Sequence, residues 1–400
     1  MRKKQAEQTA AMLSVNSMNI AFDAKRLYNN FTGLGNYSRT TIDILTENHP
    51  ENAYFLFTPK IADRRSNERG ITSKYLTLDH CDTILPQGLV KGSLWRTFQV
   101  TDEAKKIHAD IFHGLSNELP YGLRKKGIAS VVTIHDVAFH TFPYMYHWHD
   151  RKIYDMKWRY AIQNADRIIA ISECTKNDII KYYDVDENKI DIIYQPVSRR
   201  FYSTMTDDEA TKILSDTELC TIKDFILYVG TINSRKNLLG IVKALKLLPD
   251  SIKLPLIVVG NGREYKEEVK KYIRQHDMER MVIFPKEKID DNTLQALYTK
   301  ARVFVYPSFY EGFGLPVVEA LLSKCPVVTS NRSSLPEAGG KDSLQVDPDS
   351  IEDIADKMER AITDDELREK MINKGMEYAI KNFHPANVAN SLINTYNKAL

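Results

Sequence analysis

The chain has 400 residues, which is too long for one ordinary hydrophobic core and predicts two domains. Hydrophobic residues make up 43% and charged residues 27% of the sequence, as is usual for a globular protein in water. The 55 lysines and arginines are balanced by 53 aspartates and glutamates, which argues against a general nucleic-acid binder.

The cysteines and the apolar runs favour a cytoplasmic protein. The four cysteines are scattered without CxxC spacing, which indicates reduced thiols rather than a disulfide framework or a zinc site. No apolar run approaches the roughly 18 to 20 residues of a membrane span, and the basic N-terminal tip lacks the apolar region of a signal peptide. We expect residues 1–17 to be a disordered extension or the result of an early start codon.

Short apolar runs alternate with helical patterns along the chain, as in parallel sheets whose strands are buried on both faces. This alternation occurs twice and predicts an α/β protein with two doubly wound, Rossmann-like domains. The predicted strands are 18–24, 53–59, 109–114, 130–136, 167–172 and 189–197 in the first half, and 225–231, 254–260, 281–285, 301–308 and 326–330 in the second.

A polar stretch at 198–222 separates the two series of strands. We predict an N-terminal domain at 18–200 and a C-terminal domain at 201–383, both of ordinary size. Ligands of such sheets bind beyond the carboxyl ends of the strands. The residues that follow the strands are therefore the first candidates for a functional site.

Two groups of candidates follow strands of the N-terminal domain. Gly33 and Gly35 precede a helical pattern, where glycines let the backbone approach a ligand and a helix start suits a phosphate; a tight loop without a ligand is the alternative. His135 ends a buried strand, where it can bind a sugar hydroxyl or act as an acid or base. It can equally hold a loop to the sheet.

Two adjacent cations follow the first strand of the C-terminal domain. Arg235 and Lys236 lie at a strand-to-helix turn, where they can clamp a diphosphate. The alternative is a solvated charge pair on a loop. We favour the diphosphate clamp, because a doubly wound domain takes its phosphates at this turn.

The loop within 307–330 carries the densest pattern. Glu311 and Glu319 bracket a glycine-containing turn that leads into a helix with Pro316 at its first position. The helix start offers amide donors for a phosphate, and the two carboxylates offer acceptors for hydroxyls. A nucleotide sugar has this layout of ribose, diphosphate and sugar. The alternative is that Glu319 favours the helix dipole and Glu311 is exposed to solvent.

No metal site is expected. His140, His147 and His149 lack a recognisable ligand spacing. The DxD pairs at 184–186 and 347–349 lie in turns beside strands, so we interpret them as turn residues.

Several segments resemble those of the family 4 retaining glycosyltransferases, which have the GT-B fold. The Glu311-to-Glu319 spacing within EGFGLPVVE resembles the family's signature. The details most resemble the mannosyltransferase-like members that build bacterial surface polysaccharides. The similar segments occur in the family's order and cover nearly the whole chain from Met18: GLGNYSR, ADIFHGLSNELP, TIHD, ADRIIAISECTKNDI, YVGTINSRKN, LYTKARVFVYPSFYEGFGLPVVEAL and SSLPEAGG.

The resemblance implies two domains facing a central cleft, with a helix at 384–400 crossing back to the N-terminal domain. It implies that Glu311 contacts hydroxyls of the transferred sugar and that Glu319 holds the ribose. The backbone N–H groups that would face the sugar or the diphosphate are those of Phe313, Gly314 and Leu315.

The resemblance also implies roles for the other candidates. Arg235 and Lys236 would neutralise the leaving diphosphate, and His135 would contact the transferred sugar from the other domain. Gly33 and Gly35 would form the loop near the phosphates and the acceptor.

Two departures from the family pattern are visible. Gly230 belongs to the donor-binding turn, but many relatives carry a basic residue soon after it, where Thr231 and Ile232 stand here. Relatives also often have an aromatic residue where His384 precedes the last helix.

The implied reaction is metal-independent, retaining transfer of a hexose from a nucleoside diphosphate sugar to a sugar hydroxyl of a growing surface glycan. Mannose from GDP-mannose is the favoured donor, and no cofactor is expected. The partners would be this donor and a glycan or lipid-linked glycan acceptor, with no nucleic acid. The alternatives are a sugar-nucleotide epimerase, another GT-B enzyme, or a nucleotide-sugar-binding scaffold without activity.

Peripheral contact with the inner face of the plasma membrane stays open. Lys91, Trp95, Arg96, Lys105 and Lys106 lie in one segment of the acceptor-side domain. They would form either a basic face with one tryptophan for an anionic membrane or an ordinary solvated helix face.

Overall fold

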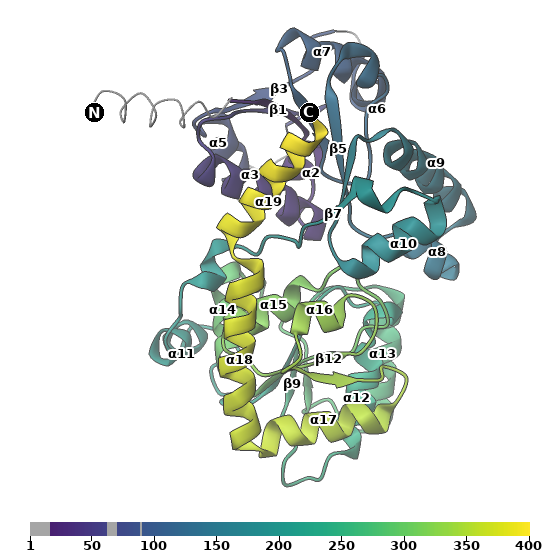
Figure 1. Cartoon of the computed structure of the whole chain (residues 1–400). Coiled ribbons are helices and arrows are strands. Elements are labelled where there is room, and N and C mark those ends of the chain that lie inside the picture. Colours follow the sequence, from purple (N-terminus) through teal and green to yellow (C-terminus); the bar gives the residue numbers. More distant parts are fainter. Residues whose placement is uncertain (1–16, 62–69, 89) are drawn as a thin grey trace, which may run out of the picture. The chain divides into compact units, whose positions relative to one another are not determined.

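The computed structural model describes residues 17–61, 70–88 and 90–400, which form two compact units (Figure 1). The N-terminal unit comprises the described residues up to Ile171, Lys176–Pro196 and Pro385–Leu400, and the C-terminal unit comprises Ser172–Thr175 and Val197–His384. The sequence places the boundary after residue 200, and the structure places it after Pro196. The extension expected at 1–17 lies outside the described residues except for Ser17.

Seven parallel strands form the sheet of the N-terminal unit, in the order β3-β2-β1-β4-β5-β6-β7. The order reverses between β1 and β4, where doubly wound sheets bind ligands. The strands are β1 (Asn19–Asp23), β2 (Ala53–Phe57), β3 (Cys81–Ile84), β4 (Ile111–Gly114), β5 (Ala129–Ile134), β6 (Arg167–Ala170) and β7 (Ile190–Ile192).

Six parallel strands form the sheet of the C-terminal unit, in the order β10-β9-β8-β11-β12-β13. This order places β8 beside β11, so the loops that follow these two strands are neighbours. The strands are β8 (Ile226–Val229), β9 (Leu256–Val259), β10 (Val282–Ile283), β11 (Val303–Tyr306), β12 (Val327–Ser330) and β13 (Leu344–Val346).

Two strands, β3 and β13, are absent from the sequence prediction. Each lies at an edge of its sheet, where only one neighbour pairs with it. Asp82 and Thr83 interrupt β3, and Gln345 interrupts β13. Neither segment therefore forms the continuous apolar run that identified the buried strands.

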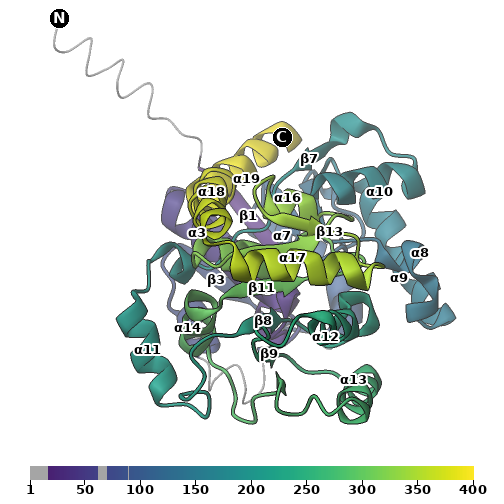
Figure 2. The ribbon, with the colours of Figure 1, turned by 90° about the horizontal axis from the view of Figure 1, so that it is seen from below.

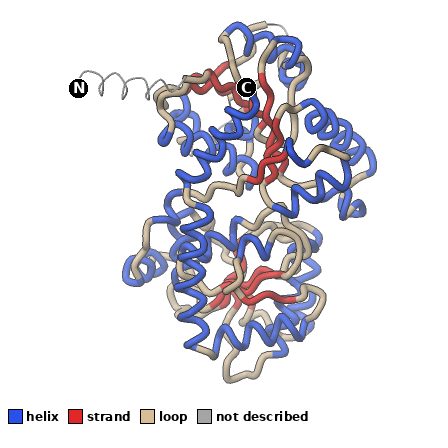
Figure 3. The backbone as a smooth tube through the Cα atoms, in the orientation of Figure 1, coloured by secondary structure: helices blue, strands red, loops and turns tan. Residues whose placement is uncertain are grey.

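Helices cover both faces of each sheet, with the strands between them (Figure 3). In the N-terminal unit the helical elements are α2 (Lys25–Asn29), α3 (Gly33–Asn48), α5 (Ile71–Leu76), α6 (Gly92–Leu94), the π-helix η1 (Trp95–Gln99), α7 (Val100–Lys106), η2 (Arg124–Lys126), α8 (Ala138–Thr141), η3 (Pro143–Met145), α9 (Trp148–Asn164), α10 (Glu173–Tyr183, whose first turn belongs to the C-terminal unit), η4 (Glu187–Lys189) and α19 (Pro385–Ala399).

The C-terminal unit is built in the same way, and Figure 2 shows α12 beside α17, which pack on each other. Its helical elements are η5 (Arg199–Tyr202), α11 (Asp207–Ser215), η6 (Ser234–Lys236), α12 (Leu238–Leu247), α13 (Glu264–Gln275), α14 (Asp291–Lys300), α15 (Leu315–Leu322), α16 (Leu335–Gly339), α17 (Ile351–Thr363) and α18 (Asp365–Phe383).

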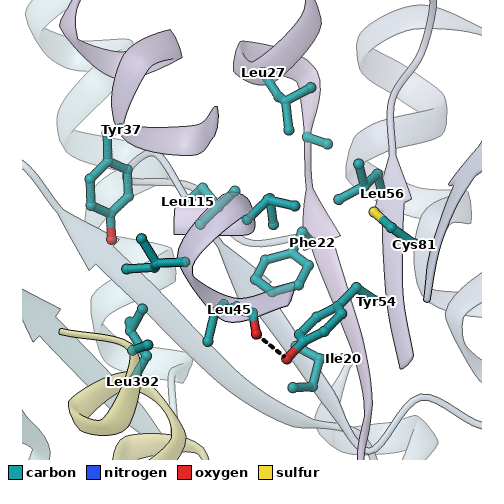
Figure 4. Packing of buried hydrophobic residues seen from close by; sticks show 14 of the residues in the cluster. Ile20, Phe22, Leu27, Tyr37, Leu45, Tyr54, Leu56, Cys81, Leu115 and Leu392 are labelled. Carbon is teal, nitrogen blue, oxygen red and sulfur yellow. Dashed lines mark hydrogen bonds between the residues drawn. The ribbon is translucent and has the colours of Figure 1, made fainter. Parts of the chain in front are cut away.

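The N-terminal sheet has an apolar core on each face because successive residues of a strand point to opposite sides. Ile20 and Phe22 of β1 belong to one core cluster, and Ala21 belongs to the other. Figure 4 shows Phe22 beside Tyr54, whose hydroxyl donates a hydrogen bond to the Leu45 carbonyl at 3.1 Å.

The last helix, α19, returns to the N-terminal unit. Leu392 and Tyr396 are fully buried in the same core cluster as Phe22. The Tyr396 hydroxyl lies 2.8 Å from Nδ1 of His113 on β4. Burial of these side chains and this hydrogen bond hold α19 to the N-terminal sheet.

Candidate active site

The loop between β11 and α15 has one backbone conformation that requires glycine. Gly314, directly before α15, has a φ of +121°, which side-chain-bearing residues rarely adopt. A Cβ atom there would lie 2.8 Å from Cδ2 of Leu335 and 3.1 Å from Cβ of Ala338. Packing against α16 and the positive φ therefore both demand a glycine at the start of α15.

Hydrogen bonds fix the rest of this loop. The Ser172 hydroxyl donates to the Gly312 carbonyl at 2.7 Å, which explains why Ser172 belongs to the C-terminal unit. The Ser334 hydroxyl lies 2.8 Å from the carbonyl oxygens of both Glu311 and Phe313. The Phe313 ring packs edge-on against Phe383. The loop is thus held in one shape by the protein itself.

Glu311 lies buried in a cage of hydrogen-bond donors. Its Oε1 atom accepts from the Lys236 ammonium at 2.8 Å, the Ser308 hydroxyl at 2.8 Å and the Tyr306 hydroxyl at 3.0 Å. Its Oε2 atom lies 3.1 Å from Nη1 of Arg235. The carboxylate therefore has a donor on each oxygen, contrary to the alternative of a solvent-exposed glutamate.

The cage keeps Glu311 ionised. Burial alone would raise the pKa of this carboxyl, but the attraction of Lys236 and Arg235 and the hydrogen bonds from Lys236 and Ser308 outweigh it. The result is a pKa lowered from 4.5 to about 2. Such a carboxylate is a weak base and a weak nucleophile at neutral pH.

Arg235 and Lys236 lie in η6, close to the end of β8. The Asn233 side chain accepts a hydrogen bond from the Lys236 amide at 3.1 Å and caps this turn. The Lys236 ammonium donates to the Tyr306 hydroxyl and lies 4.9 Å from the centre of that ring. Arg235 also donates to the Tyr310 carbonyl. The two cations are therefore held on Glu311 rather than solvated, as one alternative had it.

Gly230 directly follows β8 and lies beside the same residues. Its φ is +155°, and a Cβ atom there would lie 3.4 Å from Cδ of Lys236 and 3.5 Å from Cε2 of Tyr306. The structure thus brings together Gly230, Arg235, Lys236 and Glu311, as the sequence predicted. Two cations surround one carboxylate, which leaves an excess positive charge for an anionic ligand.

Glu319 lies apart from this cage. It occupies the second turn of α15, and its Oε2 atom accepts from the Tyr298 hydroxyl at 3.1 Å. Burial raises the pKa of its carboxyl from 4.5 to about 7, against the opposing hydrogen bond from Tyr298. Glu319 is therefore a separate acceptor whose charge changes near neutral pH.

His135 follows β5 in the N-terminal unit, and protein groups bind both of its ring nitrogens. Nε2 lies 2.9 Å from the Leu115 carbonyl, which can only accept, so Nε2 carries the proton. Nδ1 then accepts from the Gln195 amide at 2.9 Å. Burial lowers the pKa of His135 from 6.5 to about 4, so the ring is neutral at pH 7. A sugar hydroxyl would have to replace the Gln195 amide at Nδ1.

Gly33 and Gly35 differ in what requires them. A Cβ atom on Gly35 would lie 1.8 Å from the Asn30 carbonyl oxygen, so the close approach of α2 and α3 explains this glycine. A Cβ atom on Gly33 would meet no atom within 4 Å. Of these two glycines, packing explains Gly35 but not Gly33, which is the first residue of α3.

The segment left open between a membrane face and a solvated helix face fits neither alternative at Trp95 and Arg96. Trp95 is fully buried, with its indole N–H donating to Glu103 at 2.8 Å, and Arg96 forms ion pairs with Asp23 and Glu118. Among the described residues, none of the helices has the length and apolar character that a bilayer span requires.

The DxD pairs are turn residues, as predicted. Asp186 accepts from the Asn188 amide at 3.0 Å and begins η4. Asp347 and Asp349 both pair with Arg332. Within residues 17–61, 70–88 and 90–400, no group of three or more histidine, cysteine, aspartate or glutamate side chains is arranged to hold a metal ion.

Three side chains that define the candidate site are absent from the sequence prediction. Tyr306 and Ser308 bind Glu311, and Gln195 binds His135. Tyr306 ends β11 and Ser308 follows it, so the rule that selected the other candidates at strand ends would have found these two. Gln195 lies in the segment after β7 and carries no comparable signal.

Comparison with known proteins matches this chain to glycosyltransferases. Residues 47–200 match the model described as Glycosyltransferase Family 4, and residues 212–378 match the one described as Glycosyl transferases group 1. The chain is 32% identical over 289 residues to the O-antigen chain mannosyltransferase B of Escherichia coli, which covers 72% of this chain and 74% of that protein.

Two solved structures resemble the whole fold. A glycosyltransferase from Rickettsia africae matches with a TM-score of 0.73 and 17% identity over 96% of this chain and 99% of that one. The Anabaena protein Alr3699/HepE, solved in complex with UDP-glucose, matches with a TM-score of 0.71 and 16% identity over 94% of this chain and 99% of that one.

Proposed function

Because this chain belongs to the family 4 glycosyltransferases, we propose that it transfers mannose from a nucleoside diphosphate sugar to a sugar hydroxyl of a growing surface glycan. The observation that carries the proposal is the cage of Arg235, Lys236 and Glu311 beside the start of α15. The mannosyltransferase relative from Escherichia coli supports mannose, and GDP-mannose is the donor that we test first.

The cage explains how the donor diphosphate would be bound and released. Arg235 and Lys236 neutralise Glu311 in the free protein and would turn toward the diphosphate when a donor binds. Negative charge grows on the leaving diphosphate during glycosyl transfer, and the two cations and the start of α15 would stabilise that charge. Glu311, relieved of part of its pairing, would then accept hydrogen bonds from hydroxyls of the transferred sugar.

Retention would follow from a front-face route without a covalent intermediate. In the donor complex Glu311 would remain a poor nucleophile, because the Tyr306 and Ser308 hydroxyls donate to its Oε1 atom and sugar hydroxyls would take the place of the two cations. The departing phosphate would take the proton of the acceptor hydroxyl. A trapped covalent glycosyl–enzyme on Glu311 would contradict this route.

Glu319 and His135 would orient the substrates. The Glu319 carboxylate would hold the ribose of the donor, and its hydrogen bond from Tyr298 fixes the side chain in place. The neutral His135 ring would contact the transferred sugar through Nδ1. Gly33, where a Cβ atom would meet no other atom within 4 Å, would let the phosphates or the acceptor approach the backbone.

The reaction would need no metal ion, because Arg235, Lys236 and the start of α15 supply the positive charge that a divalent cation provides in other transferases. Activity in EDTA tests this proposal. Activity that is lost in EDTA and restored by manganese would contradict it.

Peripheral membrane contact is proposed for an exposed face of α9 and η3. Tyr144, Trp148, Ile153 and Met156 are exposed apolar side chains, and the Lys152 ammonium lies 5.0 Å from the Trp148 ring centre. Aromatic and basic side chains together favour an anionic lipid surface.

Sedimentation with anionic and with zwitterionic vesicles tests this face. Trp148→Ser should abolish pelleting with the anionic vesicles. The matched control is Leu247→Ser, which changes an exposed leucine of the C-terminal unit and should leave pelleting unchanged. Equal pelleting of both variants and the wild type would contradict the proposal.

Thermal stabilisation by a panel of nucleotide sugars tests the donor. GDP-mannose at 100 times its dissociation constant should add about 2.7 kcal/mol of stability. Transfer to a mannose-terminated acceptor should then occur with the same donor. Conversion of the donor without any acceptor would favour the epimerase alternative, and binding without turnover would favour the scaffold.

A further inference from the structure

A cluster of charged side chains lies at the carboxyl ends of β1 and β4, at the switch point of the N-terminal sheet. Arg96 is at its centre, with Nε 2.8 Å from Oδ2 of Asp23 and a second ion pair to Glu118. The Lys157 ammonium lies 3.4 Å from Oε1 of Glu118. The side chains of Arg96 and Asp23 are only 11% and 5% exposed.

The cluster carries more positive than negative charge. Lys25 and Arg26 of α2 directly follow β1 and add two half-buried cations. Within the ranges that the structure describes, neither of their side chains has a carboxylate ion-pair partner. Four cations (Lys25, Arg26, Arg96 and Lys157) therefore surround two carboxylates (Asp23 and Glu118), which leaves two uncompensated positive charges.

The cations repel one another. Burial, followed by the charges of Arg96 and Arg26, lowers the pKa of Lys25 despite the opposing effect of Asp23. Burial, followed by the charge of Arg96, also lowers the pKa of Lys157. Arg26 contributes to the lowered pKa of His135 as well, after burial, so the cluster lies within electrostatic reach of the proposed sugar-binding histidine.

We propose that these six residues, the basic cluster, bind a diphosphate of the acceptor, so that the acceptor is a glycan carried on a lipid diphosphate. The inference rests on the proposed function and names the acceptor class for it. Two uncompensated charges match a diphosphate diester, and lysine and arginine side chains are the usual ligands of phosphate oxygens. Asp23 and Glu118 hold Arg96 in place without neutralising the cluster.

The position of the basic cluster favours a diphosphate of the acceptor, rather than inorganic anions from solution, as its ligand. It lies where doubly wound sheets bind ligands and close to His135. Partly buried cations also interact with an anion through a lower dielectric than exposed lysines do. A diphosphate bound there would hold the first sugars of a short glycan within reach of His135.

The diphosphate of the donor could also bind to the basic cluster, so the test compares two acceptors. One is a mannose-terminated disaccharide on farnesyl diphosphate, and the other is the same disaccharide on a neutral octyl group. Lys25→Met and Lys157→Met each remove one charge and keep the aliphatic stem. Lys125→Met, an exposed lysine of η2 outside the cluster, is the matched control.

Each cluster variant should raise KM for the diphosphate acceptor about ten-fold, as expected for the loss of one charge-assisted hydrogen bond. KM for the octyl acceptor and for the donor should stay within about two-fold of the wild type, a change of less than about 0.5 kcal/mol. An equal rise in KM for both acceptors would overturn the proposal and would indicate that the two lysines have only a structural role. A rise in the donor KM alone would assign the diphosphate to the donor.

Calorimetric titration with farnesyl diphosphate separates this inference from the proposed function, because binding needs no transfer. Binding that is about ten-fold weaker in Lys157→Met, with farnesol as the negative control, would support the basic cluster even if no sugar were transferred. Equal binding by the wild type and both cluster variants would overturn it even if transfer were efficient.

Discussion

Replacement of Glu311 by glutamine tests the cage most directly. The variant keeps the size of the side chain and one acceptor oxygen, but it removes the charge that pairs with Lys236 and Arg235. It should destabilise the free protein, abolish most of the transfer activity, and strengthen the binding of a nucleoside diphosphate.

The magnitude follows from the pKa of Glu311. A shift from 4.5 to about 2 corresponds to about 3 kcal/mol of interaction that favours the charged carboxylate. Loss of this charge leaves two buried cations without their counterion, so we expect Glu311→Gln to lower the free energy of unfolding by about 2–4 kcal/mol. Because the folded-state pKa is lowered, the stabilisation is present above pH 4.5 and is lost as the pH falls toward 2.

The assay is urea unfolding with and without GDP, together with transfer kinetics. The phosphates of GDP would give Lys236 and Arg235 a new counterion, and Glu311 no longer competes for them in the variant. If GDP binds about ten-fold tighter to Glu311→Gln, equal GDP concentrations add about 1.4 kcal/mol more stability to the variant than to the wild type. Glu359→Gln on the exposed face of α17 is the control.

One result would refute this reasoning. If GDP stabilised Glu311→Gln less than the wild type, Arg235 and Lys236 would not pass from Glu311 to the diphosphate. A variant as stable as Glu359→Gln would show that the carboxylate charge does not hold the cage together.

The remaining predictions concern four single positions. Because the folded-state pKa of Glu319 is raised, its contribution to stability falls as the pH rises from 4.5 through 7. The free energy of unfolding in urea of the wild type, minus that of Glu319→Gln, should therefore decrease over this range. A constant difference would contradict the raised pKa. His135 is neutral above pH 5, so its ionisation should not affect kcat/KM between pH 5.5 and 8. The pH profiles of the wild type and of His135→Gln should therefore have the same shape in this range, and an ionisation seen only in the wild type would contradict the prediction. Gly314→Ala should lower the melting temperature by an amount equivalent to about 1–3 kcal/mol. The reason is that a Cβ atom would lie 2.8 Å from Leu335 Cδ2 at a φ of +121°. Gly33→Ala should leave the melting temperature unchanged but raise KM for donor or acceptor, and unchanged kinetics would remove Gly33 from the site.

The architecture was predictable because the strands of a parallel sheet are buried on both faces. Runs such as 225–231 and 301–308 have few polar interruptions, so their burial can be read from the chain alone. The edge strands β3 and β13 were not predicted, because only one side of each is paired and their sequences contain Asp82, Thr83 and Gln345.

Several residues of the candidate site could also be named from the sequence, because ligand-binding residues of such domains follow the strands. Which of them touch one another was not. Lys236 and Glu311 are 75 residues apart, and they meet because β8 pairs with β11 across the sheet. The order of strands in a sheet is set by long-range packing, which local patterns do not encode.

Burial decided the remaining points. Trp95 and Arg96 lie in a polar stretch that resembles an exposed helix face, yet the indole is buried and Arg96 is drawn into ion pairs with Asp23 and Glu118. Gly35 was a candidate for ligand binding, but the neighbouring Asn30 carbonyl requires it. The sequence by itself determined the two domains and the chemical groups at the strand ends, because these depend on local apolar patterns. Only the tertiary structure decided which charges pair, because pairing depends on distances between segments that are remote in the chain.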